Sequence, residues 1–127
     1  MGYIQYNENP CGKIVGDCVI RAVSKVTGLS WDDIYDVLCY IGKKSCDMPN
    51  SSTVYGKFLR DNGFRKYAIP NTCPTCYTVH DFCHEHPYGV YVLCTGSHVI
   101  AVIDGNYYDA WDSGYENPQY YFIKEVY

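Results

Sequence analysis

A cysteine near the start of the chain has the setting of a nucleophile. Cys18 follows the loop residue Gly16 at the position where a helix is expected to begin. A helix N-terminus presents unpaired N–H groups and positive potential, which lower the pKa of a thiol toward the thiolate. The same N–H groups can stabilise an oxyanion that forms on an attacked carbonyl. A buried core thiol explains Cys18 equally well on this feature alone.

A histidine far along the chain could supply the base. His98 lies at the head of the apolar run 99–103, just after the turn residues 95–97. A polar ring at the start of a buried strand needs a hydrogen-bond partner, and a thiolate is a suitable one. A cysteine at a helix start with a distant histidine is a known nucleophile–base arrangement. The alternative is a hydrogen-bonded surface histidine.

An aspartate after the next turn could orient the imidazole. The dipeptide 104–105 is Asp-Gly, which predicts a two-residue hairpin. A two-residue turn places His98 opposite Trp111 and puts Asp109 on the same face, one diagonal step away. A three-residue loop would shift the register by one and bring Asp112 to that face. We predict Asp109 as the third member of the site, with Asp112 as the alternative.

The elements that position these residues follow from apolar periodicity and capping signals. They predict four helices, over about 17–26, 30–41, 53–60 and 78–86. They predict strands over 66–69, 90–93, 99–103, 107–111 and 120–126. Residues 1–16 and 42–51 are expected to be irregular. The sequence therefore predicts a single α+β domain over 1–127, with N-terminal helices packed on a C-terminal antiparallel β-sheet.

Composition excludes several classes of partner. The chain has 127 residues, of which 47% are hydrophobic, so it can bury a core. Its formal net charge of −4 argues against nucleic acid and against an anionic membrane surface. No apolar run approaches the roughly 20 residues of a membrane span. The first residues lack the features of a signal peptide, so a cytoplasmic location is expected.

Eight cysteines need an explanation. We expect most to be reduced, with Cys39, Cys83 and Cys94 as small buried apolar side chains. A disulfide scaffold is the alternative. The Cys73-Pro74-Thr75-Cys76 segment has the gap of a zinc knuckle, and its remaining ligands would come from Cys46, His80, Cys83, His84 and His86. A tight turn with free thiols is the preferred interpretation, and no metal or cofactor is predicted.

These motifs resemble a known superfamily. Gly16-Asp17-Cys18 opening a helix, with His98 on a strand and an Asp after an Asp-Gly hairpin, resembles the papain-like cysteine peptidases. The pattern is similar to the domains that trim bacteriocin leader peptides and to transglutaminase-like proteins. The chain also resembles a family of small bacterial and phage proteins, which brings no activity, in the strings 6–10, 16–18, 73–79, 96–99 and 108–113.

The resemblance implies roles for the site residues. It makes Cys18 the nucleophile, His98 the general base and Asp109 the orienting group. Papain-like peptidases usually place a glutamine six residues before the nucleophile as an oxyanion donor, and here that position is Gly12. Asn9, which the following proline should hold extended, is the candidate for that role.

The expected function is a cysteine peptidase reaction. It is the hydrolysis of a peptide or isopeptide bond in a peptide or protein substrate, through a thioester acyl-enzyme. The alternatives are transglutaminase-like acyl transfer with the same triad, and a non-catalytic protein-binding module with a structural zinc. The sequence leaves the oligomeric state open.

Overall fold

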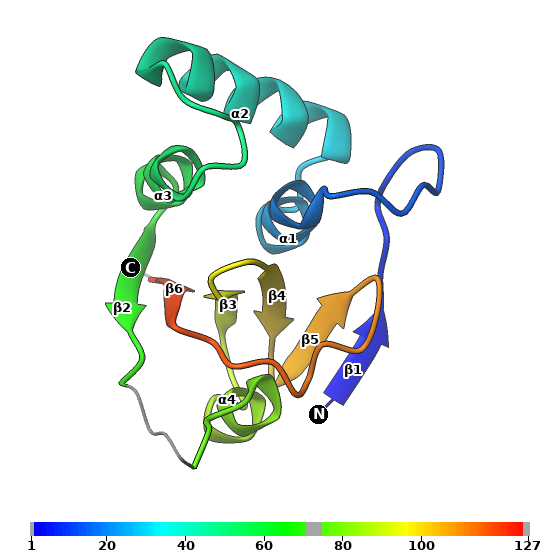
Figure 1. Cartoon of the computed structure of the whole chain (residues 1–127), viewed down its shortest axis with the longest axis vertical. Helices are drawn as coiled ribbons and strands as arrows, with labels where there is room; N and C mark the ends of the chain where they lie inside the picture. The colour runs from blue at the N-terminus through cyan, green and yellow to red at the C-terminus, as the bar shows by residue number, and fades with distance from the viewer. Residues whose placement is uncertain (1, 71–74, 126–127) are drawn as a thin grey trace.

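The computed structural model describes residues 2–70 and 75–125. Within these ranges the chain forms four helices and one six-stranded sheet (Figure 1). The helices are α1 (Cys18–Thr27), α2 (Trp31–Ser45), α3 (Ser52–Asp61) and α4 (Val79–Glu85). The strands are β1 (Gly2–Gln5), β2 (Phe64–Ala68), β3 (Val90–Cys94), β4 (Val99–Ile103), β5 (Asn106–Asp109) and β6 (Tyr120–Lys124).

The helices begin and end at the capping residues that the sequence indicates. Ser30 accepts a hydrogen bond from the Asp33 N–H at the start of α2. Thr78 opens α4 with a complete capping box. Helix α1 ends at Gly28, whose φ of 76° is left-handed. Helix α2 runs four residues further than predicted, because two lysines in its last turn suit the negative end of the helix and Cys46 closes it in a left-handed conformation.

The sheet differs from the predicted one at its edges. The strand order is β1-β5-β4-β3-β6-β2, and every neighbouring pair is antiparallel except β1 with β5. Residues 2–5 were expected to be irregular, and they instead form a parallel edge strand. Strand β2 begins two residues earlier than predicted and forms the other edge, beside the C-terminal strand β6.

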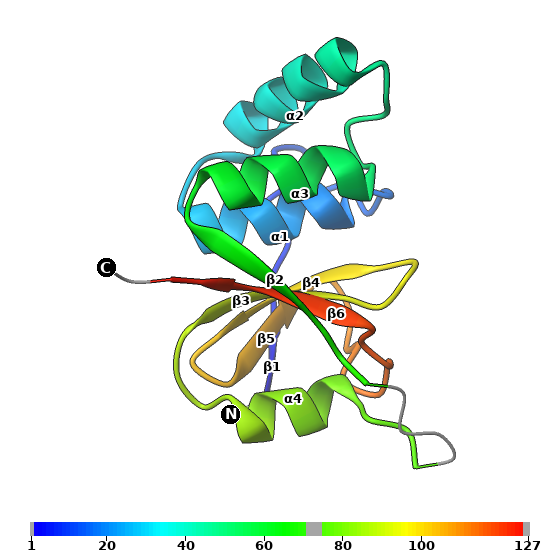
Figure 2. The same ribbon diagram turned by 90° about the vertical axis from the view of Figure 1, so that its left-hand side faces the viewer.

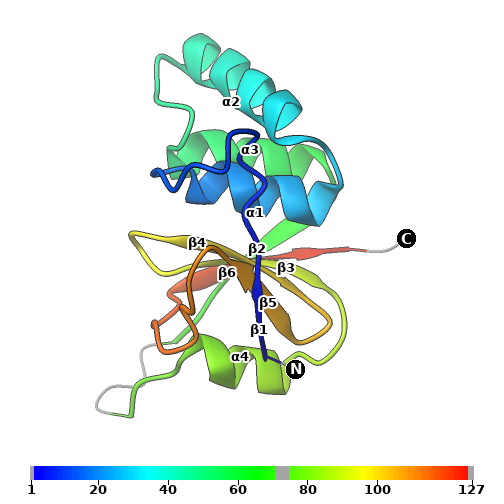
Figure 3. The same cartoon turned by 90° about the vertical axis from the view of Figure 1, so that its right-hand side faces the viewer.

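Helices cover both faces of the sheet. Helices α1, α2 and α3 lie on one face and α4 lies on the other (Figures 2 and 3). Strand β4 is apolar on both sides for this reason: Val99 and Ala101 pack in the core under α1–α3, whereas Ile100 and Val102 pack in the core under α4. The fully apolar run that follows His98 is therefore a central strand.

The hairpin between β4 and β5 has the predicted two-residue turn. Asp104 and Gly105 have φ values of 51° and 77°, and Ile103 pairs with Asn106 across the strands. This register determines which aspartate can reach His98.

None of the four helices in the described ranges combines the length and apolar character that a bilayer crossing requires.

Candidate active site

Cys18 and His98 meet where α1 approaches the start of β4. Cys18 is the first residue of α1, and His98 ends the turn that joins β3 to β4. The Cys18 thiol is near enough to the His98 ring and to the backbone N–H of Val99 for both groups to shift its pKa, and all three residues line one cavity. The His98 ring is buried, with 7% of its side chain exposed. The structure therefore brings the predicted nucleophile and base together.

The contact favours the charged forms of both groups. Burial raises the pKa of Cys18, but the hydrogen bonds from His98 and Val99, with the charges of His98 and Arg21, bring it below the ordinary value for a thiol. Burial lowers the pKa of His98, and its hydrogen bonds to Asp109 and Cys18 more than offset this, raising it to about 9. Each group therefore shifts the pKa of the other in the direction that a thiolate–imidazolium pair requires.

Asp109 is the aspartate that contacts the imidazole. Its Oδ2 lies 2.6 Å from His98 Nε2, which leaves Nδ1 of the ring for Cys18. Burial raises the pKa of Asp109, but hydrogen bonds from His98 and Ser113 lower it below its usual range. Asp112 is exposed and accepts hydrogen bonds from the Tyr107 hydroxyl and the Gly114 N–H instead. It is not placed to orient His98.

Asp109 is held by several groups in addition to His98. Ser113 Oγ donates to its Oδ2 over 2.6 Å, and the Ala110 N–H donates to its Oδ1 over 2.8 Å. Its backbone carbonyl accepts from the N–H of Tyr6 over 2.8 Å and from the hydroxyl of Tyr3 over 3.2 Å. The N-terminal strand and the residues after it therefore fix the backbone of Asp109.

Arg21 links Asp109 to the helix that carries Cys18. Its Nη2 lies 3.2 Å from Asp109 Oδ1, and its Nη1 is paired with Asp17 Oδ1. Trp31 Nε1 donates to the other oxygen of Asp17 over 2.9 Å. All three charged side chains are at most 4% exposed. Sequence analysis missed this network, although Asp17 and Arg21 have the i,i+4 spacing of a helical ion pair.

The same network leaves the N-terminus of α1 without a side-chain cap. Asp17 is the N-cap residue, but its side chain accepts no hydrogen bond from the helix N–H groups. Its carboxylate is directed to Arg21 and Trp31 instead. The first N–H groups of α1, next to Cys18, therefore keep their capacity to donate to an oxyanion.

Trp111 covers the imidazole. The two rings stack with centroids 4.5 Å apart and planes inclined by 25°, and the Arg21 guanidinium lies 5.7 Å from the Trp111 ring. The stack holds the His98 ring in the plane that meets both Asp109 and Cys18. The two-residue turn sets the β4–β5 register that leads the chain from Asp109 to Trp111 beside His98.

A cleft of about 460 Å³ opens beside Cys18 and His98. Its lining includes Tyr55 and Tyr120, whose hydroxyl oxygens are 2.6 Å apart. Its remaining lining residues are Val19, Asn50, Ser52, Cys94, Gly96, Ser97, Val99 and Gln119. We refer to this space as the catalytic cleft.

Asn9 does not line the catalytic cleft. It lines a separate pocket beside Asp17, and its Oδ1 accepts hydrogen bonds from the N–H groups of Cys11 (2.9 Å) and Lys13 (3.3 Å). The loop thus turns back on Oδ1 of the asparagine, and the oxyanion role of its amide Nδ2 stays a prediction. Asn50 and Gln119 are the side-chain amides in the cleft, and their sequence context gave no signal of this.

Most of the other cysteines are reduced thiols in the part of the chain that the structure describes. Cys11, Cys39, Cys46, Cys83 and Cys94 form no disulfide there. Cys83 and Cys94 are buried as predicted, and burial raises the pKa of each to about 11. Cys39 is only partly buried. Cys73 lies outside the described residues, and residues 2–70 and 75–125 contain no group of three metal-ligating side chains placed to hold an ion.

Comparisons with protein-family models, with curated proteins and with solved structures found no match for this chain.

Substitutions of Asp109 and Asp112 test which aspartate is the third member of the site beside Cys18 and His98. In Asp109→Asn the negative charge beside His98 is lost, so the pKa of His98 should fall and the thiolate–imidazolium pair should weaken. We expect alkylation of Cys18 at pH 6 to slow by roughly tenfold or more. Asp112→Asn is the matched control and should alkylate at the wild-type rate. Equal rates in the two variants would contradict the assignment, provided that thermal melting shows both to be folded.

Proposed function

We propose that this protein is a papain-like cysteine hydrolase that cleaves a peptide or isopeptide bond. The observation that carries the proposal is that Cys18 and His98 lie together on the wall of a cleft, with the His98 ring hydrogen-bonded to the buried Asp109 behind it. The three residues come from a helix N-terminus, the start of a buried strand and the end of its antiparallel neighbour. The α+β arrangement of helices and sheet agrees with the papain-like resemblance of the sequence.

The contacts support a two-step reaction. The Cys18 thiolate attacks the carbonyl carbon, and the N–H groups at the start of α1 donate to the oxyanion. The His98 imidazolium gives its proton to the departing amine, the C–N bond breaks and a thioester remains on Cys18. His98 then takes a proton from water, and the resulting hydroxide attacks the thioester. The acid product leaves as the Cys18 sulfur is released, and the thiolate–imidazolium pair is restored.

Buried groups keep the imidazole in place during this cycle. Asp109 accepts from Nε2 in both protonation states of the ring, so the other nitrogen remains directed at the Cys18 sulfur. Ser113 and Arg21 occupy further acceptor sites of Asp109, and all of these side chains are buried. The carboxylate therefore needs no water to satisfy it and has little freedom to rotate away.

A peptide mixture tests the proposed reaction. Wild-type protein is incubated with a defined library of synthetic peptides, and mass spectrometry follows new termini and any acyl adduct on Cys18. We expect cleavage by the wild type, a thioester on Cys18 that hydroxylamine removes, and neither in Cys18→Ala. Products that carry an added amine would instead support the transglutaminase-like reaction. Cleavage that persists in Cys18→Ala would refute both.

A further inference from the structure

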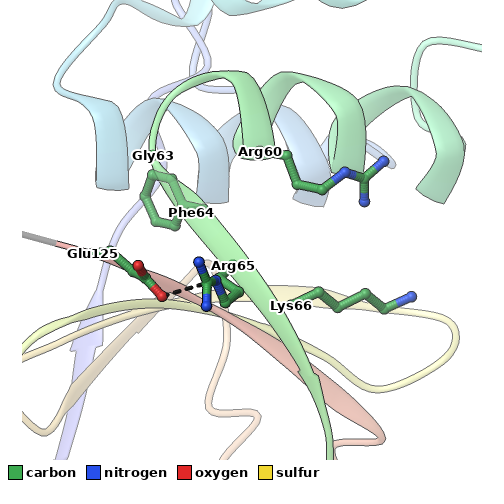
Figure 4. A pocket seen from close by; sticks show the side chains of 6 residues that line it. All are labelled: Arg60, Gly63, Phe64, Arg65, Lys66 and Glu125. Atoms are coloured by element: carbon green, nitrogen blue, oxygen red, sulfur yellow. Dashed lines mark ion pairs between the residues drawn. The ribbon is translucent and has the colours of Figure 1, made fainter.

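A further cavity lies between α3 and β2. Figure 4 shows its lining, which consists of Arg60, Gly63, Phe64, Arg65, Lys66 and Glu125. Three of these six side chains are cationic and one is anionic. Because the whole chain carries a formal charge of −4, this concentration of positive charge is a local feature. We call this space the basic cavity.

Two of its cations are not neutralised. Arg65 Nε lies 3.0 Å from Glu125 Oε1, so these two charges offset each other. Neither Arg60 nor Lys66 has a carboxylate partner anywhere in residues 2–70 and 75–125. Their side chains extend to the same side, away from the Arg65–Glu125 pair (Figure 4). The basic cavity therefore has a net excess of two positive charges that the described part of the chain leaves available to an anion.

The basic cavity adjoins the catalytic cleft at Tyr120. Lys66 Nζ lies 4.3 Å from the centroid of the Tyr120 ring, and Tyr120 lines the catalytic cleft together with Cys18 and His98. The Lys66 charge also acts on Cys94, a second residue of the cleft wall. A peptide that occupies the catalytic cleft would therefore reach Lys66 and Arg60 on passing Tyr120.

We propose that Arg60 and Lys66 bind a carboxylate side chain of the peptide substrate, so that the enzyme selects peptides with an aspartate or glutamate close to the bond it cleaves. The inference rests on the proposed function. A guanidinium and an ammonium that line one cavity can each donate charge-assisted hydrogen bonds to a carboxylate. The excess positive charge also attracts an acidic peptide within a protein that otherwise repels it.

Covalent probes test this without a known substrate. A series of peptidyl acyloxymethyl ketones carries a single glutamate at successive positions, and each has a glutamine counterpart. The rate of Cys18 modification is measured by mass spectrometry and is divided by the iodoacetamide rate of the same protein. We expect one glutamate probe to react roughly tenfold faster than its glutamine counterpart at low salt, and the ratio to shrink as salt is added.

Charge variants then locate the preference. In the double variant Arg60→Gln, Lys66→Gln the glutamate-to-glutamine ratio should fall to about one. Lys57→Gln is the matched control, because it removes one positive charge from the same helix at an exposed residue paired with Asp61. It should keep the wild-type ratio. Thermal melts of the variants establish that they are folded.

Two results would overturn the inference while leaving the proposed function intact. One is an equal rate for every glutamate and glutamine pair with wild-type protein. The other is a preference that survives in the double variant. A Cys18 that reacts neither with iodoacetamide at low pH nor with any probe would instead overturn the proposed function, and this inference with it.

Discussion

Replacing His98 with alanine should slow the alkylation of Cys18 by iodoacetamide at pH 6 roughly a hundredfold. An ordinary thiol with a pKa near 8.5 is only about 0.3% thiolate at that pH. In the wild type, the hydrogen bond and charge of His98 hold the pKa of Cys18 below its ordinary value despite burial. In the variant, Cys18 loses the hydrogen bond and the charge of His98, while the burial that raises its pKa remains. Mass spectrometry of the native protein measures the rate at each cysteine separately.

The other thiols supply controls within the same sample. Cys11 and Cys46 are exposed and report whether the reagent is active. Cys83 and Cys94 are buried, and the raised pKa of each should keep them unreactive in a folded protein. A Cys18 that alkylates no faster at pH 6 than Cys11, or that is unaffected by the loss of His98, would remove the basis for a catalytic site.

The same pair sets the sign of the pH dependence of hydrolysis. Cys18 must be ionised, so activity should rise with pH through the lowered pKa of the thiol. His98 must carry the proton for the leaving group, so activity should fall as pH passes about 9. Because the groups interact, the two limbs belong to the pair rather than to either residue. Alkylation needs only the thiolate and should show no fall above pH 9.

Replacing Arg21 with methionine should cost roughly 3–5 kcal/mol of folding free energy. The substitution leaves the carboxylates of Asp17 and Asp109 buried without the cation that they share. A buried charge without its partner keeps its desolvation cost and loses the compensating attraction. Urea denaturation followed by circular dichroism measures the loss.

An exposed ion pair is the matched control for Arg21. Lys57 pairs with Asp61 at the same i,i+4 spacing, with both side chains more than half exposed. Lys57→Met should change the free energy of unfolding by less than about 1 kcal/mol. If Arg21→Met were no more destabilising than Lys57→Met, the buried network could not be what fixes Asp109 in place.

Local signals predicted much of the site. Ser30 and Thr78 cap helices with their own side chains, and Asp104-Gly105 adopts the turn that its composition favours. These preferences act within a few residues, so a single sequence reveals them. The turn then fixed the register, and the register distinguished Asp109 from Asp112.

The remaining features depend on partners distant in sequence. Strand β1 has four residues, and it is stabilised as a strand by β5, to which it pairs near the other end of the chain. Arg21 is a charged residue of the kind that usually faces solvent on a helix. Only the folded chain brings Asp109 to it. Asn9 lines a pocket other than the catalytic cleft, and its Oδ1 accepts hydrogen bonds from its own loop, which the sequence did not indicate. Non-local contacts of this kind leave no periodic pattern in the sequence.

The position of β6 has a consequence for the order in which the protein can be made. This last strand lies between β3 and β2, so β2 has no neighbour in the sheet until β6 has been synthesised. A ribosome-bound chain that ends before β6 therefore lacks the strand that completes the sheet beneath α3 and that supplies Tyr120 to the catalytic cleft. Because this strand pairing joins residues far apart in sequence, the folding rate should be slow for a single-domain protein. The Cys18 thiol thus acquires its finished cleft only after residues 120–124 have been translated.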